Sequence, residues 1–455
     1  MCVNDERKDK GIIMKVNKRI AKSILHALEG GMVPENGLPY IAVGRKEEVE
    51  VITRDMDRIA EGHSTFRLLE GAYGTGKSFM AQLIKNEALL RDFVVMDCEL
   101  APERKLCGTK KEGLETYRML TSRLSTRTCP SGGALQEILD TYVYRMQEEA
   151  ANQGITAPEE ILAYMESAGA DLKKKIEQMP HGFDFYEALH LYMECTVHKR
   201  EEEKTELLRW FRGEYHTKTE AKKFVGLAVI VEDSSWFAYI KLLALFVKEA
   251  GYTGMYMILD ELTQITRNIV NSTTREHNFE RLLSIYNDCY GNGARYMGII
   301  LCGIPSSIHD PKRGIFSYEA LKSRLSTSRL QGDELLGSPI LKLSMLTPEE
   351  FAALIERVEE MHAMLHDKEG YFTEEERITF VNCEYQRIGA ASHLTPREFI
   401  RDFLTILNLK AEKRPDDSME DFLYRGGGIE MTASMIGQDE EDDEEFEVRY
   451  ESFTL

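Results

Sequence analysis

The sequence predicts an α/β fold, with a mostly parallel five-stranded sheet, flanking helices, a large helical insertion and a C-terminal helical lid. Three observations support this prediction. Short apolar runs typical of buried strands recur between residues 66 and 343, and helical periodicity follows most of them. Residues 99–233 show mainly helical patterns. Residues 346–425 also look all-helical, because capping boxes at Thr347, Thr373 and Thr395 open the helices predicted there.

Five segments are predicted as strands because they are short and rich in apolar residues. Their apolar residues run continuously instead of alternating, which is typical of parallel strands covered on both faces. The segments are 66–70, 93–97, 255–261, 296–303 and 339–343. An amphipathic helix is predicted over residues 16–28, before the first strand. In the insertion, a Thr156-x-x-Glu159 capping box predicts one helix whose apolar stripe runs through residues 161–176.

A glycine-rich segment joins the first strand to the next helix and fits the pattern Gly, four residues, Gly-Lys-Ser/Thr. Its glycines let backbone N–H groups curl around phosphate oxygens, and the helix start adds partial positive charge. Lys77 supplies a full charge, and the Ser78 hydroxyl can bind Mg²⁺. The alternative is an ordinary Gly-rich turn. The predicted nucleotide-binding residues are Gly71, Ala72, Tyr73, Gly74, Thr75, Gly76, Lys77, Ser78 and Phe79.

The third predicted strand ends in Asp260 and Glu261. A buried parallel strand delivers such carboxylates to the edge of the sheet where ligands bind. We expect Asp260 to hold Mg²⁺ opposite Ser78, and Glu261 to orient and deprotonate the attacking water. The alternative is a strand followed by an acidic helix cap. Together with the glycine-rich segment, this strand end predicts an ATPase that uses ATP and Mg²⁺. GTP is not expected, because no Asn-Lys-x-Asp motif occurs.

An apolar turn with a Gly-Arg pair precedes the glycine-rich segment. Residues 40–47 resemble the box of AAA+ ATPases close to the origin-recognition and STAND groups, which packs near the adenine. This resemblance implies that Val43, Gly44 and Arg45 contribute to the nucleotide site. The alternative is an ordinary helix start.

Two arginines are candidates for reading the state of the nucleotide. Arg397 falls in the first turn of a helix that begins at Thr395, where the helix dipole disfavours a cation unless an anion lies close. A γ-phosphate would be such an anion. Arg324 lies in a helix predicted over residues 318–325, a position from which an arginine commonly reaches a neighbouring subunit's site, so self-association is expected. For both, the alternative is an exposed surface arginine.

Taken together, these segments resemble the ATP-binding proteins of bacterial BREX (bacteriophage exclusion) defence systems, BrxD type, over most of residues 16–425. The segments that carry the resemblance are 44–45, 70–79, 259–261, 318–325 and 394–398. The resemblance implies an AAA+-like, ASCE-type P-loop NTPase with a helicase-like or other DNA-processing partner in prokaryotic anti-phage defence. It also implies a polar sensor of the γ-phosphate near the end of the fourth strand. Residues 304–307 depart from that pattern, which leaves the sensor unassigned.

Composition limits the partners that can be expected. The formal net charge is −20, so the overall field does not attract nucleic acid, and any DNA contact is expected to be indirect. The eight cysteines include no C-x-x-C pair, which is typical of reduced thiols in a cytoplasmic protein. No apolar run approaches the ~18 residues that would span a bilayer, so no membrane partner is expected.

Four parts of the chain are predicted. They are an N-terminal helical segment with the adenine-side box (1–60), a P-loop ATPase core (61–345) with its insertion at about 99–233, a helical lid (346–425) and an acidic tail (426–455). The tail is expected to be disordered when free, and either aids solubility or docks on a basic partner.

Three functions are compatible with these patterns. The first is a switch or motor subunit driven by ATP hydrolysis. The second is a nucleotide-licensed binding module with little hydrolysis that assembles a defence complex. The third is a DNA loader or translocase whose ATPase activity DNA stimulates.

Overall fold

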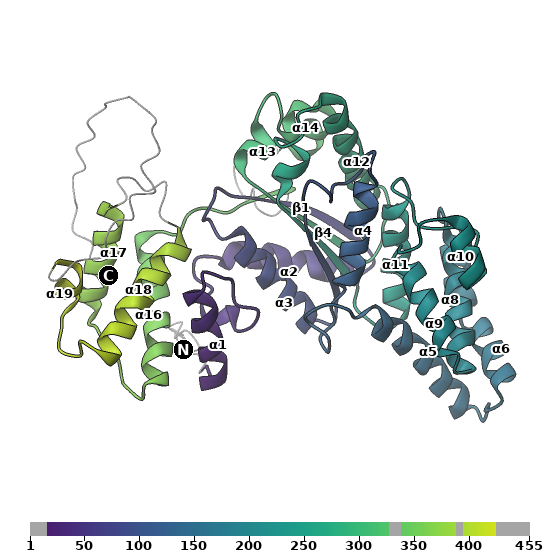
Figure 1. Ribbon diagram of the computed structural model, residues 1–455, viewed down its shortest axis with the longest axis horizontal. Coiled ribbons are helices and arrows are strands. Elements are labelled where there is room, and N and C mark those ends of the chain that lie inside the picture. The colour runs from purple at the N-terminus through teal and green to yellow at the C-terminus, as the bar shows by residue number, and fades with distance from the viewer. Residues whose placement is uncertain (1–15, 327–337, 388–394, 425–455) are drawn as a thin grey trace, which may run out of the picture.

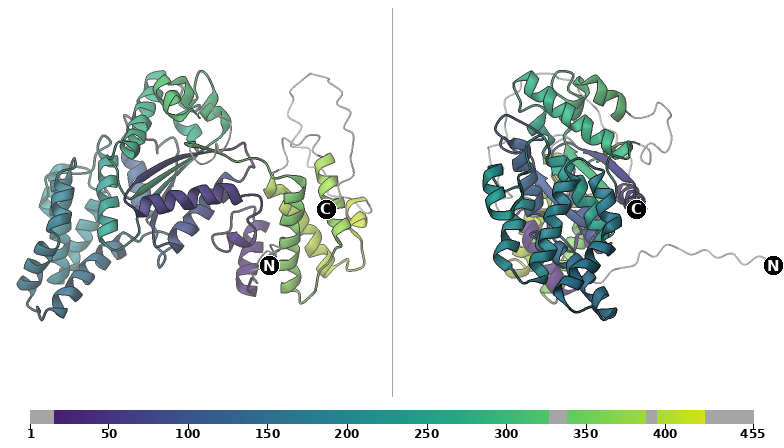
Figure 2. Two further views of the ribbon diagram at one scale, coloured as in Figure 1. Left: turned by 180° about the vertical axis from the view of Figure 1, so that it is seen from behind. Right: turned by 90° about the vertical axis from the view of Figure 1, so that its right-hand side faces the viewer.

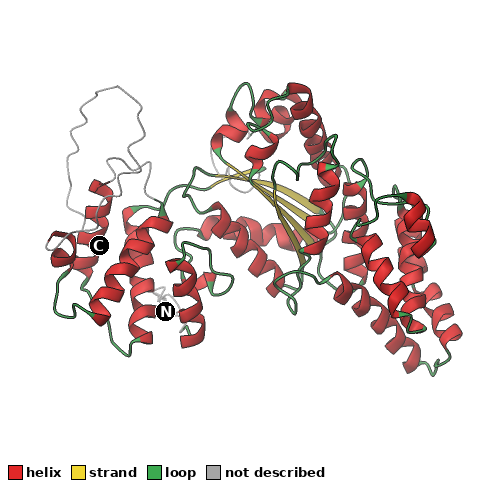
Figure 3. Cartoon of the chain, in the orientation of Figure 1, coloured by secondary structure: helices red, strands yellow, loops and turns green. Residues whose placement is uncertain are grey.

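The computed structural model describes residues 16–326, 338–387 and 395–424, which form three regions in a row (Figure 1). A sheet with its covering helices lies in the middle, and Figure 3 shows that the strands are confined to this region. Helices of the insertion extend to one side. The C-terminal helices, together with the first helix of the chain, lie on the other side, and the view from behind in Figure 2 shows the same order.

The five predicted strands are confirmed, and they form one sheet in the order β2-β3-β4-β1-β5. Every pairing between these strands is parallel, so the sheet is all-parallel rather than mostly parallel. The strands are β1 (Ser64–Glu70), β2 (Val94–Glu99), β3 (Met255–Asp260), β4 (Met297–Gly303) and β5 (Ile340–Lys342). Glu70 pairs with Gly303, and Glu99 pairs with Asp260. The register therefore brings the carboxyl ends of neighbouring strands to one edge.

Helices cover both faces of the sheet, which explains why the strands are apolar throughout. One face packs on α2 (Lys46–Ala60) and α3 (Lys77–Leu90), and the other packs on α4 (Glu112–Ser122), α11 (Trp236–Glu249) and α12 (Ser272–Tyr290). β3 shows the division. Met257 and Leu259 join the hydrophobic cluster that contains α4, α11 and α12. Tyr256 and Ile258 join the cluster on the other face.

The insertion shares the first of these clusters with the sheet, so it is packed on the core rather than separate from it. Its further helices are α5 (Leu135–Asn152), α6 (Pro158–Ala168), α7 (Ala170–Glu177), α8 (Gly182–Val197), α9 (Glu201–Phe211) and α10 (Lys218–Val225).

The single helix predicted over the stripe at 161–176 is wrong. Gly169, a poor helix former, ends α6 and begins α7, so the stripe is divided between two helices. The predicted cap is also displaced. The N-cap of α6 is Ala157, because Pro158 occupies the first helical position, and Thr156 does not cap.

The C-terminal region consists of α16 (Pro348–Leu365), α17 (Glu374–Arg387), α18 (Pro396–Glu412) and α19 (Met419–Tyr424). The capping box predicted at Thr347 is present, because its hydroxyl accepts from the N–H of Glu350 while the Glu350 carboxylate accepts from the N–H of Thr347. The first helix, α1 (Lys18–Glu29), packs on α16 and α18 instead of on the sheet. This contact brings the first described helix against the C-terminal helices.

Short elements complete the described chain. They are η1 (Leu38–Tyr40), η2 (Leu262–Ile265), α13 (Pro305–His309), η3 (Ile315–Ser317) and α14 (Glu319–Leu325). No helix of the described ranges is both long enough and apolar enough to cross a bilayer. The prediction for the acidic tail lies outside the described residues.

Candidate functional site

A cavity of about 360 Å³ lies at the carboxyl edge of the sheet, where three parts of the chain meet. The glycine-rich loop and the end of β3 supply its polar side. The segment from α1 to α2 and the C-terminal helices supply a largely apolar side. Such a combination of a few convergent polar groups with an apolar wall is typical of a small-molecule site. The polar lining consists of Arg45, Thr75, Lys77, Ser78, Asp260, Glu261, Thr395 and Arg397.

The loop between β1 and α3 takes its shape from its glycines. Gly74 and Gly76 have φ angles of +82° and +89°, which side chains with a Cβ rarely adopt. At Gly74, a Cβ would lie only 2.7 Å from Cγ2 of Thr395, so a glycine is also needed for contact with α18. Gly76 is the N-cap of α3, and the helix therefore directs its N-terminus at the cavity.

Lys77 is the first residue of α3, and its side chain folds back over the loop. Its Nζ donates hydrogen bonds of 2.9 Å to the backbone oxygens of Gly71 and Ala72. Burial lowers the pKa of Lys77, and the nearby Asp260 carboxylate opposes this change. The ammonium group thus lines the same cavity as the carboxylates of Asp260 and Glu261.

Ser78 and Asp260 approach each other at the cavity. The Ser78 hydroxyl lies 3.4 Å from Oδ2 of Asp260, although the two residues are 182 positions apart. A hydroxyl and a carboxylate are the hard oxygen ligands that suit Mg²⁺, which usually takes only one or two protein groups beside phosphate oxygens. Within the described ranges, no group of three or more His, Cys, Asp or Glu could hold a metal. Ser78 and Asp260 could together supply two oxygen ligands to a Mg²⁺ ion.

Glu261 follows directly and has an unusual backbone. Its φ and ψ of 63° and 54° lie in the left-handed region, which costs a non-glycine residue conformational energy. Its carboxylate accepts a hydrogen bond from the hydroxyl of Thr263. Burial raises the pKa of Glu261, and the neighbouring Asp260 charge raises it further. The carboxylate is thus held in place, and its affinity for a proton is increased.

The predicted adenine-side residues lie next to the loop, but they do not all line the cavity. Val43 and Arg45 line the cavity, whereas Gly44 lies against Glu350 of α16. Arg45 is buried, and its Nη2 donates to the backbone oxygens of Thr75 at 2.7 Å and Ser344 at 2.8 Å. This arginine therefore ties the loop to the chain that leaves β5.

The structure also brings Arg397 to this cavity. It is an exposed residue in the first turn of α18, and its side chain lies against Gly31, where a Cβ would be 3.2 Å from its Cδ. Thr395, the N-cap of α18, touches the loop at Gly74. The start of α18 thus closes the cavity from the C-terminal region.

Arg324 does not lie in the cavity. It is exposed on α14, where Nε donates to Oδ1 of Asn287 at 3.0 Å and Nη1 donates to the oxygen of Ala320. The segment after β4 supplies no lining residue either. The hydroxyl of Ser306 accepts from Arg267, and the Ser307 hydroxyl is buried with no hydrogen-bond partner among the described residues.

Several residues of the site were not predicted. Apolar side chains from distant segments form the wall opposite the loop, and Thr263 holds Glu261. Arg357 of α16 donates to the oxygen of Ala42 at 3.0 Å, which fixes the turn before Arg45. A periodic pattern shows only whether such residues belong to the core or to the surface. It does not show that they line a site. The unpredicted apolar lining includes Leu28, Val33, Leu346, Leu354 and Ile400.

Comparison with known proteins gives one family. The model described as BREX system ATP-binding protein BrxC/D matches residues 16–425, a range that includes every lining residue of this cavity. No curated protein matches the chain.

Proposed function

This chain belongs to the BREX system ATP-binding protein BrxC/D family, and from that premise we propose that it is a Mg²⁺-dependent ATPase. In this proposal it acts as a switch or motor subunit of anti-phage defence. The observation that carries the proposal is the 3.4 Å approach of Ser78 to Asp260 in the cavity that Lys77 and Glu261 also line. The strand order supports an AAA+-like, ASCE-type core, because β4 lies between β1 and β3.

ATP would lie with its phosphates on the glycine-rich loop and its base against the apolar wall. Backbone N–H groups of residues 71–78 and the N-terminus of α3 would receive the phosphate oxygens. Lys77 would exchange its bonds to the loop carbonyls for bonds to phosphate. Ser78 and Asp260 would hold Mg²⁺, which when bound neutralises phosphate charge.

Glu261 would act as the general base in hydrolysis. Its carboxylate, fixed by Thr263, would accept a proton from the attacking water, and its raised pKa strengthens it as a base. The left-handed backbone of Glu261 is consistent with a functional constraint at this position. Lys77 would stabilise the negative charge that develops on the transferred phosphoryl group.

Arg397 would read the γ-phosphate in the same chain. Its place at the first turn of α18 supports this role, since an anion there relieves the unfavourable position of the cation. Arg324 would act in a neighbouring subunit, because it is exposed outside its own cavity. We therefore propose self-association. The group that senses phosphate at the end of β4 stays unassigned.

The proposal also covers the C-terminal helices, the partners and the location of the protein. The C-terminal helices would act as a lid, the insertion would contact a helicase-like or other DNA-processing partner, and DNA contact would be indirect. Within the family we favour the BrxD type. We also propose a cytoplasmic location, because cysteines without a C-x-x-C pair are typical of reduced thiols.

One experiment distinguishes this proposal from its two alternatives. The mass of the purified protein and its ATPase rate are measured with and without ATP and duplex DNA. A switch or motor subunit hydrolyses ATP at a rate that rises with self-association. Complex formation with ATP but without turnover would favour the nucleotide-licensed binding module. A rate that depends on DNA, and falls steeply with salt, would favour the loader or translocase.

A further inference from the structure

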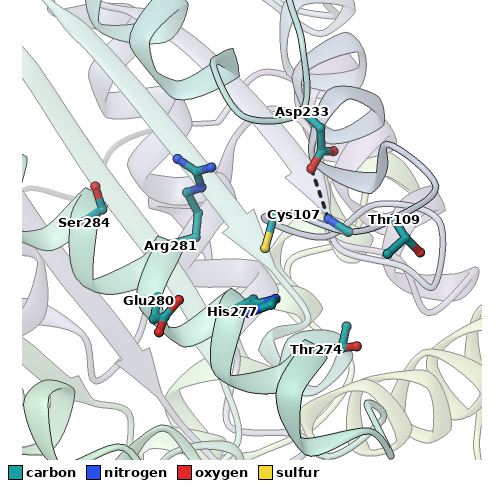
Figure 4. A pocket seen from close by; sticks show the side chains of 9 residues that line it. Cys107, Thr109, Asp233, Thr274, His277, Glu280, Arg281 and Ser284 are labelled. Carbon is teal, nitrogen blue, oxygen red and sulfur yellow. Dashed lines mark hydrogen bonds between the residues drawn. The ribbon is translucent and has the colours of Figure 1, made fainter.

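A second cavity, of about 500 Å³, lies on the other face of the sheet and shares no lining residue with the first. Figure 4 shows it between α12 and the backbone around Cys107, which follows β2. Its size is within the range of small-molecule sites. Neither the family match nor the proposed ATPase activity assigns a role to it.

Two side chains fix the wall formed by residues 106–114. Oδ1 of Asp233 accepts from the N–H of Gly113 at 2.6 Å and of Leu114 at 3.1 Å, and Oδ2 accepts from the N–H of Gly108 at 3.1 Å. Three N–H groups therefore share the charge of this carboxylate. Asp233 therefore stabilises the wall. The three hydrogen bonds also reduce the negative charge that its carboxylate presents to the cavity.

Asn278 of α12 fixes the same wall from the other side. It is fully buried, and its Oδ1 accepts from the N–H of Leu106 at 3.1 Å and of Cys107 at 3.3 Å. Its Nδ2 donates to the oxygens of Cys107 and Thr274. The amide thus uses both its oxygen and its nitrogen, and it holds α12 against the wall. A backbone wall that is already fixed contacts a ligand without the cost of ordering that wall.

The opposite wall is a polar stripe on α12. His277, Arg281 and Ser284 follow one another at intervals of four and three residues, which places them on one face of the helix. Across from them lies Thr109. Within the described ranges, none of these four side chains makes a hydrogen bond or an ion pair.

Arg281 is the main cation of this stripe. It is half-buried and has no carboxylate partner in the described part of the chain. Glu280 also lines the cavity, but Figure 4 shows its carboxylate and the Arg281 guanidinium leaving α12 in different directions. A guanidinium presents a fork of donors that matches phosphate or carboxylate oxygens.

We propose that this cavity binds a phosphorylated small molecule, whose phosphate contacts Arg281. His277, Ser284 and Thr109 would donate to the remaining phosphate oxygens. This set of donors suits a phosphate, which has three free oxygens, better than a carboxylate, which has two. The rest of the cavity would hold the group that the phosphate esterifies. This proposal goes beyond the ATPase activity and does not depend on it.

Cys107 provides a local readout, because it lines the cavity and a ligand would cover its thiol. Burial raises the pKa of Cys107 to about 11, so a maleimide reacts with it slowly enough for rates to be followed by peptide mass spectrometry. The probes are inorganic phosphate and glucose 6-phosphate, with succinate at equal ionic strength. We expect both phosphates to slow labelling of Cys107 several-fold and to leave that of Cys129 unchanged.

Variants connect this protection to the proposed residues. Arg281→Gln should raise the half-protecting concentration at least about tenfold, because it removes a charge-assisted hydrogen bond. Ser284→Asp should weaken protection through repulsion of the phosphate. Lys77→Ala should retain protection, which separates this cavity from the glycine-rich loop. No protection by either phosphate, equal protection in Arg281→Gln, loss in Lys77→Ala, or protection by succinate alone would overturn the proposal.

Discussion

Nη2 of Arg45 donates a 2.7 Å hydrogen bond to the backbone oxygen of Thr75, so a residue outside the glycine-rich loop holds that loop in shape. The same guanidinium reaches Ser344, and its Nη1 lies 3.3 Å from the Glu48 carboxylate. The pattern around Arg45 indicated contact with the nucleotide. The structure adds a positioning role for this side chain.

Arg45→Ala should weaken ATP binding at least about tenfold, because it removes a charged donor from the buried oxygen of Thr75. Binding is measured by titration calorimetry. Arg54→Ala is the matched control, since Arg54 is an exposed residue of α2, the helix that begins directly after Arg45. Unchanged affinity in Arg45→Ala would show that the loop keeps its shape without this contact.

The rate of hydrolysis should depend on pH through Glu261. Burial and Asp260 raise its pKa, and a base must be deprotonated to act. Activity should therefore be present above this raised pKa, and should be lost as the pH falls through it, at a higher pH than for an exposed glutamate. Thr263→Val removes a donor to the carboxylate, so the acid limb of kcat should move to still higher pH. An acid limb that does not move would exclude Glu261 as the titrating group.

Arg397→Ala should reduce the affinity for ATP about tenfold and leave that for ADP unchanged, because only ATP carries the phosphate that this residue is proposed to contact. Both affinities are measured by competition with a fluorescent nucleotide. Arg401→Ala, one turn further along α18 and exposed, serves as the control. Equal losses for the two nucleotides would place Arg397 at a part of the site that they share.

A stability prediction concerns the pair formed by Asp55 and Arg67. Nε of Arg67 donates to Asp55 at 2.6 Å and Nη2 donates at 2.9 Å, with both residues buried. Asp55→Ala should lower the free energy of unfolding by about 3–5 kcal/mol, because it leaves the Arg67 charge buried without its carboxylate. Urea denaturation measures this change. Asp57 lies in α2 like Asp55, and Asp57→Ala removes an exposed ion pair with Arg91. This control variant should lower the free energy of unfolding by at most about 1 kcal/mol.

The sequence was sufficient to predict the sheet and its polar edge. β3 and β4 are continuous apolar runs, and each is long enough and bounded clearly enough to be identified. Asp260 and Ser78 lie close together, because parallel strands bring their carboxyl ends to one edge. The sequence pattern of the glycine-rich loop corresponds to a particular backbone shape. Each residue of the loop could therefore be predicted individually.

Contacts between helices that are distant in the sequence could not be predicted. An apolar stripe shows that α1 packs on something, but does not identify α16 and α18 as its neighbours. The same holds for Thr395, whose capping role was predicted and whose contact with Gly74 was not. Position 169 shows a different limit. The apolar period continues through Gly169, so periodicity alone did not reveal the break between α6 and α7.

The most direct test of the central claim, that the loop and the end of β3 form one ATPase site, is to measure ATP binding and turnover in Glu261→Gln. The account predicts binding within about twofold of the original protein and turnover reduced at least about 100-fold, because the base is lost and the charge-binding groups remain. Glu276→Gln, an exposed residue of α12, should leave both quantities unchanged. Full turnover by Glu261→Gln would contradict the account.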